Sequence, residues 1–156
     1  MTCYKLKRVL QIAYVQPTEY PEIQIDGENF PIPKPVTAHF RTLRKIESIQ
    51  GDVSVSLFDV PFLDRDAYLK KVLAFIDAHQ SEPSIVFLDP DIGLEPQEPD
   101  FRHVLEPEVN TIWDAMKPGD VFAFYQHQDN RRGEEWIERK QHQLERALCA
   151  GAGTVK

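Results

Sequence analysis

Short apolar stretches recur along the chain, and their spacing changes from one stretch to the next. Residues 53–58 alternate strictly between apolar residues and serine until Phe58. Residues 7–15 are rich in Val, Ile and Tyr, and residues 84–89 and 121–125 are apolar on both faces. Alternation is typical of strands that expose one face, and unbroken apolar runs are typical of buried strands. The pattern predicts four strands, with 53–58 near an edge and 84–89 in a central position.

A period near 3.6 residues occupies the stretches between these strands. It predicts helices over 36–49, 65–79, 107–116 and 133–148. Asp64 is a suitable N-cap for the second of these helices. Strands and helices alternate from residue 52 onward, which indicates an α/β fold, a Rossmann-like mostly parallel sheet flanked by helices. The last residues, AGAGTVK, suggest an incomplete C-terminal strand or a short edge strand.

Residues 16–35 interrupt the pattern. This stretch holds five prolines, and Asp26-Gly27 is a turn signal. We expect a long proline-rich loop, with room for a short hairpin around residues 22–30. Long loops in compact domains are often functional and are otherwise mobile.

Size and composition set limits on the protein class. A chain of 156 residues fits one domain, and 42% hydrophobic with 28% charged residues is typical of a soluble globular protein. No apolar run approaches the roughly 20 residues of a membrane helix, and the N-terminus lacks the features of a signal peptide. We therefore expect a cytoplasmic protein with no membrane partner. Cys3 and Cys149 form no zinc motif and are expected to be reduced thiols.

The net charge of −7 bears on the partners. It argues against broad, non-specific binding to nucleic acid, which needs a basic surface, but leaves room for a local basic groove.

Polar residues follow two of the predicted strands. Residues 86–95 read VFLDPDIGLE and residues 124–132 read FYQHQDNRR. Ligands of open parallel sheets bind beyond the carboxyl ends of the strands, and the single short crossover between these two strands predicts that they are neighbours in the sheet. The candidate catalytic residues are Asp89, Asp91 and His127, and the candidate substrate-binding residues are Glu95, Gln126, Arg131 and Arg132. Such a set suits a metal, a phosphate or a nucleoside, or acid–base chemistry with His127 as the titrating group.

Each candidate also has a structural interpretation. Asp89 precedes a proline and is suited to capping a turn. Glu95 belongs to an acidic loop that water can solvate, and His127 is equally suited to a structural hydrogen bond. Arg131 and Arg132 precede the last helix, where an anion is favoured, although exposed arginines are usually only solvated.

Several enzyme classes are excluded by missing motifs. The chain has no GxGxxG after its first strand, no GxxxxGK[ST], no GxSxG and no HExxH. The residues around Asp91 and Gly93 do not have the spacing of an EF-hand. These absences argue against a typical dinucleotide fold, a P-loop NTPase, an α/β-hydrolase and a zincin.

The two strand-end motifs resemble those of a group of uncharacterised bacterial and phage proteins, which carry DPDNGLE and a later YQH. The resemblance covers mainly residues 84–139, and Ile92 stands where the group has Asn. It implies a shared site without naming its reaction.

A more distant resemblance is to Rossmann-like S-adenosylmethionine-dependent methyltransferases. In these, a [D/N]-P-P-[Y/F]-like strand end is followed by a helix, a Lys-Pro-Gly-type turn and another strand. LDPD at 88–91 and KPGDVFAFY at 117–125 follow that order. Asp91 and Ile92 replace the second proline and the aromatic residue, and residues 7–17 lack the glycine-rich cofactor motif. The resemblance implies the fold, and leaves the methyl-transfer chemistry in doubt.

Two kinds of function are therefore expected. One is an enzyme acting on a nucleotide or nucleic acid, either methyltransferase-like with S-adenosylmethionine or a hydrolase with Mg²⁺ or Mn²⁺ held by Asp89, Asp91 and Glu95. The other is a non-catalytic phage or defence-related protein that binds a protein partner, which the acidic charge and the proline-rich loop favour. The two polar strand ends on one rim favour the enzyme.

Overall fold

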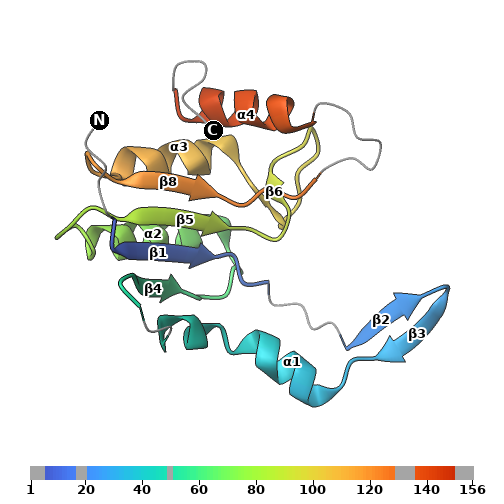
Figure 1. Ribbon diagram of the computed structural model, residues 1–156. Coiled ribbons are helices and arrows are strands. Elements are labelled where there is room, and N and C mark those ends of the chain that lie inside the picture. The colour runs from blue at the N-terminus through green and yellow to red at the C-terminus, as the bar shows by residue number, and fades with distance from the viewer. Residues whose placement is uncertain (1–5, 17–20, 49–50, 129–135, 150–156) are drawn as a thin grey trace.

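A parallel sheet forms the centre of the molecule (Figure 1). The computed structural model describes residues 6–16, 21–48, 51–128 and 136–149. The sheet has the strand order β4-β1-β5-β8. Its strands are β1 (Arg8–Ala13), β4 (Ser54–Phe58), β5 (Ile85–Asp89) and β8 (Val121–Phe124). The predicted Rossmann-like α/β fold is confirmed, and so are the central position of β5 and the edge position of β4.

The strand order creates a switch point between β1 and β5. The chain leaves β1 for β4 on one side and then crosses back to β5 on the other side, and all neighbouring strands run parallel. Crossovers on the two sides of such a point diverge, which opens a crevice at the carboxyl ends of the strands.

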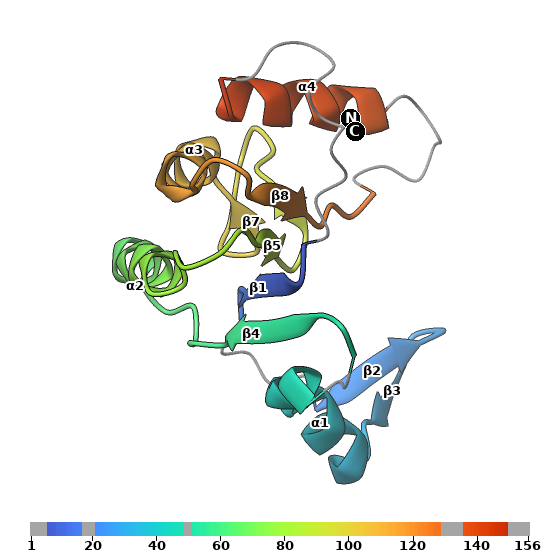
Figure 2. The same ribbon diagram turned by 60° about the vertical axis from the view of Figure 1, so that its left-hand side comes forward.

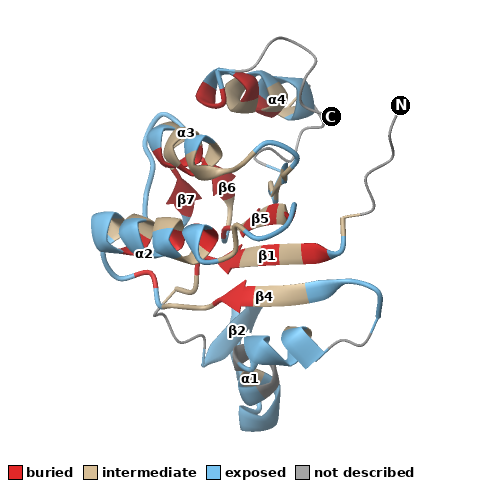
Figure 3. Cartoon of the chain, turned by 90° about the vertical axis from the view of Figure 1, so that its left-hand side faces the viewer, coloured by how far each residue is buried: buried red, intermediate tan, exposed pale blue. Residues whose placement is uncertain are grey.

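Two helices cover one face of the sheet (Figures 2 and 3). These are α2 (Arg65–Asp77) and α3 (Glu106–Ala115), while α4 (Trp136–Ala147) lies beyond the β8 edge. No described α-helix covers the opposite face, where the short 3₁₀ helix of residues 43–48 contacts the edge strand β4. The core between sheet and helices is fully buried and includes Leu10, Ile12, Val86 and Leu88 from the strands and Val72, Ile76, Val109 and Ile112 from the helices.

The start of α2 follows the prediction. Asp64 is the N-cap, and its Oδ1 accepts a hydrogen bond of 2.8 Å from the backbone N–H of Ala67. This bond satisfies one of the free N–H groups at the helix N-terminus, which is why the helix begins there.

Residues 21–48 form a projection that we call the arm. It contains a hairpin of β2 (Glu22–Ile25) and β3 (Glu28–Pro31), then α1 (Lys34–Arg41) and a 3₁₀ helix, η1 (Leu43–Ser48). Asp26 and Gly27 both have positive φ, 52° and 87°, as a two-residue type I′ hairpin turn requires. The hairpin anticipated within the proline-rich loop is therefore present.

The single helix predicted over 36–49 is wrong. The structure has two short helices that Thr42 separates, and the Thr42 hydroxyl donates a 2.8 Å hydrogen bond to the Ala38 carbonyl. A threonine side chain that bonds to the backbone competes with helix formation. Val36 and Leu43 in this segment also stay exposed, so little burial of these residues holds a longer helix together.

Other boundaries differ less. A two-residue ladder of β6 (Gly93–Leu94) and β7 (His103–Val104) lies inside the loop after β5 and was not predicted. Among the described strands β8 is at an edge, and Val121 is 47% exposed rather than buried. Ile137 in α4 is also exposed. The proposed C-terminal strand and residues 133–135 lie outside the described residues, as does Cys3, while Cys149 is an exposed free thiol.

None of the described helices is long and apolar enough to cross a membrane.

Candidate functional site at the carboxyl-terminal rim of the sheet

The two polar motifs meet at one end of the sheet. β5 and β8 are neighbours, and the Tyr125 N–H donates to the Leu88 carbonyl at 3.0 Å. Beyond the strands, the His127 N–H donates to the Ile92 carbonyl at 2.8 Å. The residues after both strands therefore share one rim, as the short crossover between them predicts.

Gln126 joins the two motifs. Its Oε1 accepts from the Leu94 N–H at 2.8 Å, and its Nε2 donates to the His127 carbonyl at 2.8 Å. Gly93 lies directly against this amide, because a Cβ at position 93 would be only 2.3 Å from Gln126 Oε1. The Gln126 amide thus has backbone partners on both sides. Gln126 was predicted to bind substrate, and in the structure both atoms of its amide bond to backbone groups of the rim.

A pocket of about 340 Å³ opens at the switch point between β1 and β5. Asp89 is half-buried there, and its Oδ2 accepts a 2.9 Å hydrogen bond from Gln11 Nε2, while Asp91 is exposed. The described residues that line the pocket include no lysine or arginine; they are Ala13, Tyr14, Val15, Gln16, Leu43, Asp89, Pro90 and Asp91. The pocket is therefore acidic, with Gln11 holding one carboxylate in place.

Tyr125 lies beside Asp89, and His127 contacts Tyr125. In the sheet, Leu88 pairs with Phe124, the last residue of β8. The next residues along the two chains, Asp89 and Tyr125, therefore lie side by side, on the face away from α2 and α3. Asp89 also pairs with Ala13 of β1. Adjacent strands are about 4.8 Å apart. Tyr125 Oη is 3.4 Å from His127 Nε2, and the two rings meet edge to face at 5.2 Å. A carboxylate, a phenol and an imidazole therefore share this part of the rim.

Glu95 does not join this group. Its Oε1 accepts a 2.6 Å hydrogen bond from the N–H of Glu106, the first residue of α3. A carboxylate at a helix N-terminus is favoured by the free N–H groups and the helix dipole. The prediction that Glu95 acts with Asp89 and Asp91 is not supported by this placement. Among the described residues, no group of three His, Cys, Asp or Glu side chains is arranged to hold a metal ion.

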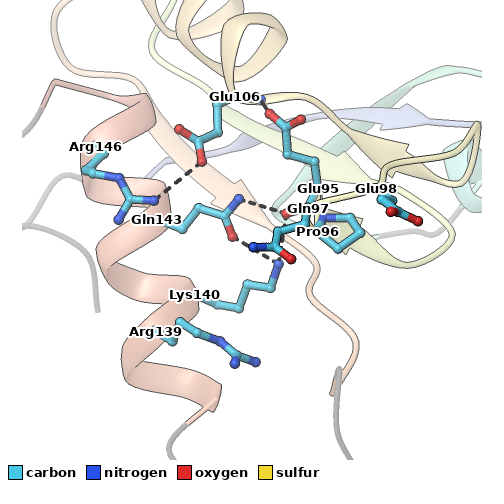
Figure 4. Close-up of a pocket in the computed structure, with 9 residues that line it drawn as sticks. All are labelled: Glu95, Pro96, Gln97, Glu98, Glu106, Arg139, Lys140, Gln143 and Arg146. Carbon is cyan, nitrogen blue, oxygen red and sulfur yellow. Dashed lines mark hydrogen bonds and ion pairs between the residues drawn. The ribbon is translucent and has the colours of Figure 1, made fainter.

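Glu95 instead borders a second hollow, between its loop and α4 (Figure 4). The buried Lys140 ammonium donates to the carbonyls of Leu94 and Glu95, at 2.9 and 3.3 Å, and to Gln143 Oε1 at 2.9 Å. Gln143 Nε2 donates to the Glu95 carbonyl at 2.8 Å. These bonds pair the polar groups of the two walls with each other. The hollow is therefore the place where α4 attaches to the loop.

A buried polar cluster lies under the rim on the helical side. Arg65 Nη1 is 2.7 Å from Glu108 Oε2, which links the first turns of α2 and α3. Tyr68 Oη donates to the Ala13 carbonyl at 2.9 Å. Burial first, and the Glu108 charge second, raise the pKa of the Tyr14 and Tyr68 phenols. This cluster fixes the end of β1 from below.

Sequence reasoning missed Gln11, Tyr125 and Lys140. Gln11 gave one signal, as a polar residue inside an otherwise apolar strand. Arg131 and Arg132 lie outside the described residues, so the structure does not place the predicted anion site.

Comparisons of the chain with protein-family models, with curated proteins and with solved structures found no match in any of the three. Function is therefore inferred from the sequence motifs and from the geometry of the rim.

Proposed function

We propose that the switch-point pocket binds S-adenosylmethionine and that the protein is a methyltransferase-like enzyme acting on a nucleotide or nucleic acid. The observation that carries this proposal is the position of Asp89 and Asp91, two carboxylates beside one pocket at the carboxyl ends of β1 and β5. Switch points of open α/β sheets are the usual place for nucleoside-type ligands.

The charge of the pocket selects among such ligands. Carboxylates accept hydrogen bonds from ribose hydroxyls, as they do in dinucleotide-binding sheets. With two carboxylates and no lysine or arginine among the described residues of its lining, the pocket repels phosphate groups and attracts cations. S-adenosylmethionine is a nucleoside derivative that has no phosphate, and its sulfonium and ammonium charges outweigh its single carboxylate. It suits this pocket better than ATP does.

The backbone at the end of β1 fits S-adenosylmethionine only in part. The residues that follow Leu10 through the end of β1 include no glycine, and Tyr14 turns into the aromatic cluster of the core. Recognition in this proposal therefore rests on side-chain carboxylates rather than on a glycine-rich backbone cradle.

Tyr125 and His127, near the pocket, are suited to binding the acceptor of the methyl group. When bound, S-adenosylmethionine supplies the methyl group. Tyr125 is 41% exposed and offers an aromatic face for a base, a role that Asp91 and Ile92 do not provide. Asp89 and His127 are positioned to take the proton that the acceptor nitrogen or oxygen releases on methylation.

Isothermal titration calorimetry tests the binding step. We expect the protein to bind S-adenosylmethionine, to bind S-adenosylhomocysteine more weakly because it lacks the sulfonium charge, and to bind ATP weakest of the three. Asp89→Asn and Asp91→Asn should each weaken binding at least about tenfold, which corresponds to roughly 1.4 kcal/mol. Asp114→Asn, an exposed substitution on α3, is the matched control and should bind like the wild type.

A second assay tests the chemistry. His127→Ala and Tyr125→Ala should keep the affinity for S-adenosylmethionine and lose transfer of a labelled methyl group to nucleotides, DNA or RNA. If the wild type does not bind S-adenosylmethionine, the proposal is wrong. Binding of Mn²⁺ that Asp89→Asn abolishes, without binding of S-adenosylmethionine, would support the metal-dependent hydrolase instead.

A further inference from the structure

Gln11 interrupts the apolar sequence of β1. Apart from Arg8, it is the only polar residue of that strand. Its neighbours Leu10 and Ile12 point into the core and are at most 1% exposed, whereas Gln11 is only partly buried. Because side chains alternate along a strand, Gln11 lies on the face away from α2 and α3, which is also the face of the candidate site.

The Gln11 amide is bonded to the carboxylate of Asp89. Ala13 of β1 pairs with Asp89 of β5, so Gln11, two residues before Ala13, lies on the same face of the sheet as that carboxylate. Its Nε2 donates a 2.9 Å hydrogen bond to Asp89 Oδ2. Only the NH₂ end of the amide can make this contact, because the carbonyl end would place an oxygen against a carboxylate. The bond therefore joins the two strands that flank the switch point.

This bond makes the two oxygens of Asp89 different. Oδ2 is engaged by Gln11, while Oδ1 has no hydrogen-bond partner among the described residues. The terminal torsion of an aspartate is broad, so an unrestrained carboxylate adopts many orientations. Hydrogen bonds to a charged group are stronger than those between neutral groups. Gln11 therefore holds the carboxylate in one orientation and leaves Oδ1 for a ligand.

Gln11 does not itself border the ligand site. The described residues that line the switch-point pocket include Asp89 and Asp91 but not Gln11. An effect of Gln11 on a bound ligand is therefore transmitted through Asp89.

We propose that Gln11 is a positioning residue that makes the pocket selective for ribose over deoxyribose. This inference rests on the binding of S-adenosylmethionine proposed above. With its orientation fixed, Asp89 Oδ1 accepts a hydrogen bond from one ribose hydroxyl. A site built to bond a hydroxyl rejects the analogue that lacks it, because a polar group of the site is then left unpaired. A carboxylate that is free to rotate can turn towards water instead, so the discrimination depends on Gln11.

Isothermal titration calorimetry with S-adenosylmethionine and its 2′-deoxy and 3′-deoxy analogues tests this role. The wild type should bind one of the two analogues at least about tenfold more weakly than the parent compound, which corresponds to roughly 1.4 kcal/mol. Gln11→Met keeps the length of the side chain and removes the donor. It should bring the three affinities within about threefold of one another. A merely structural role would lower all three affinities together and leave their ratio unchanged.

Three further variants sharpen the test. Gln11→Glu keeps the shape and polarity of the side chain but places an acceptor against Asp89, so it should lose the discrimination as well. In an Asp89→Asn background, Gln11→Met should change the affinity ratio no further, because Gln11 acts through Asp89. Gln24→Met, the same substitution in the exposed strand β2, is the matched control and should behave like the wild type.

The outcomes separate this inference from the proposed function. If the wild type does not bind S-adenosylmethionine, the proposed function is wrong and the role of Gln11 falls with it. If the wild type binds all three ligands equally, or if Gln11→Met and Gln11→Glu keep the discrimination, the proposed function stands and the role of Gln11 is wrong. A change in the ratio that persists in the Asp89→Asn background would also overturn the inference.

Discussion

The two faces of the sheet differ although they belong to the same strands. On the face towards α2 and α3, Leu10 and Leu88 are at most 1% exposed. One residue away on the other face, Gln11, Phe87 and Asp89 are only partly buried. Stability therefore comes mainly from one face, and the polar residues of the candidate site occupy the other. A carboxylate that remains in contact with water keeps its charge at little cost, whereas burial on the helical face would be expensive.

The largest expected effect on stability comes from substitutions on the two faces of one strand, β5. Leu88→Ala should lower the free energy of unfolding by roughly 2–5 kcal/mol, because it leaves a cavity in a packed core. Phe87→Ala should cost clearly less, although it removes a larger side chain, since part of that side chain already contacts water. Urea denaturation of both variants measures the difference. Equal losses would show that the second face is also packed.

A smaller effect is expected where the chain passes from the exposed rim at Asp91 to the core at Leu94. Gly93 has φ of +134°, and an added Cβ would meet Gln126. Gly93→Ala should destabilise the protein by about 1–3 kcal/mol through backbone strain alone, with a further cost from the displaced amide. The extra cost should disappear in a Gln126→Ala background, which a double-mutant cycle in urea detects. If the cost of Gly93→Ala is the same in both backgrounds, the two residues do not interact.

The smallest effect concerns the tyrosines under the rim. Tyr68→Phe should cost about 1 kcal/mol at neutral pH, because the Ala13 carbonyl loses its hydrogen bond. The pKa values of Tyr14 and Tyr68 are raised in the folded state, so their contribution is complete below the ordinary phenol pKa of about 10 and is lost as the pH rises above it. Tyr68→Phe should therefore lose less stability than the wild type between pH 7 and about pH 11. Urea denaturation at both pH values, with tyrosinate absorbance, provides the measurement. An equal loss in the two proteins would contradict this assignment.

Local sequence signals predicted the elements that depend on them. The continuous apolar run of β5 indicated a central strand, and Asp64 indicated the start of α2, because burial and capping act on neighbouring residues. The helix over 36–49 failed for the opposite reason. Its period suggested an apolar face, but Val36 and Leu43 on that face are exposed in the structure.

The site was predictable only in part. Strand order alone indicated that the residues after β5 and β8 share a rim. The separation of Glu95 from Asp89 depends on the distant N–H of Glu106, and the role of Gln126 depends on Gly93. The buried Lys140 ammonium donates hydrogen bonds to carbonyls of a loop more than forty residues earlier in the chain. The helical pattern around Lys140 does not reveal these bonds. Such contacts follow from the tertiary fold rather than from local spacing.

The close fit of Gly93 against Gln126 has an evolutionary consequence. An amide at position 126 leaves no room for a side chain at position 93, and the positive φ there independently disfavours any residue but glycine. A substitution at position 126 alone would make room for a side chain at position 93 but would leave the positive φ there unchanged. Gly93 should therefore be conserved more strictly than Gln126. Among relatives of this chain, loss of the glycine is expected only where the loop after β5 has itself been rebuilt.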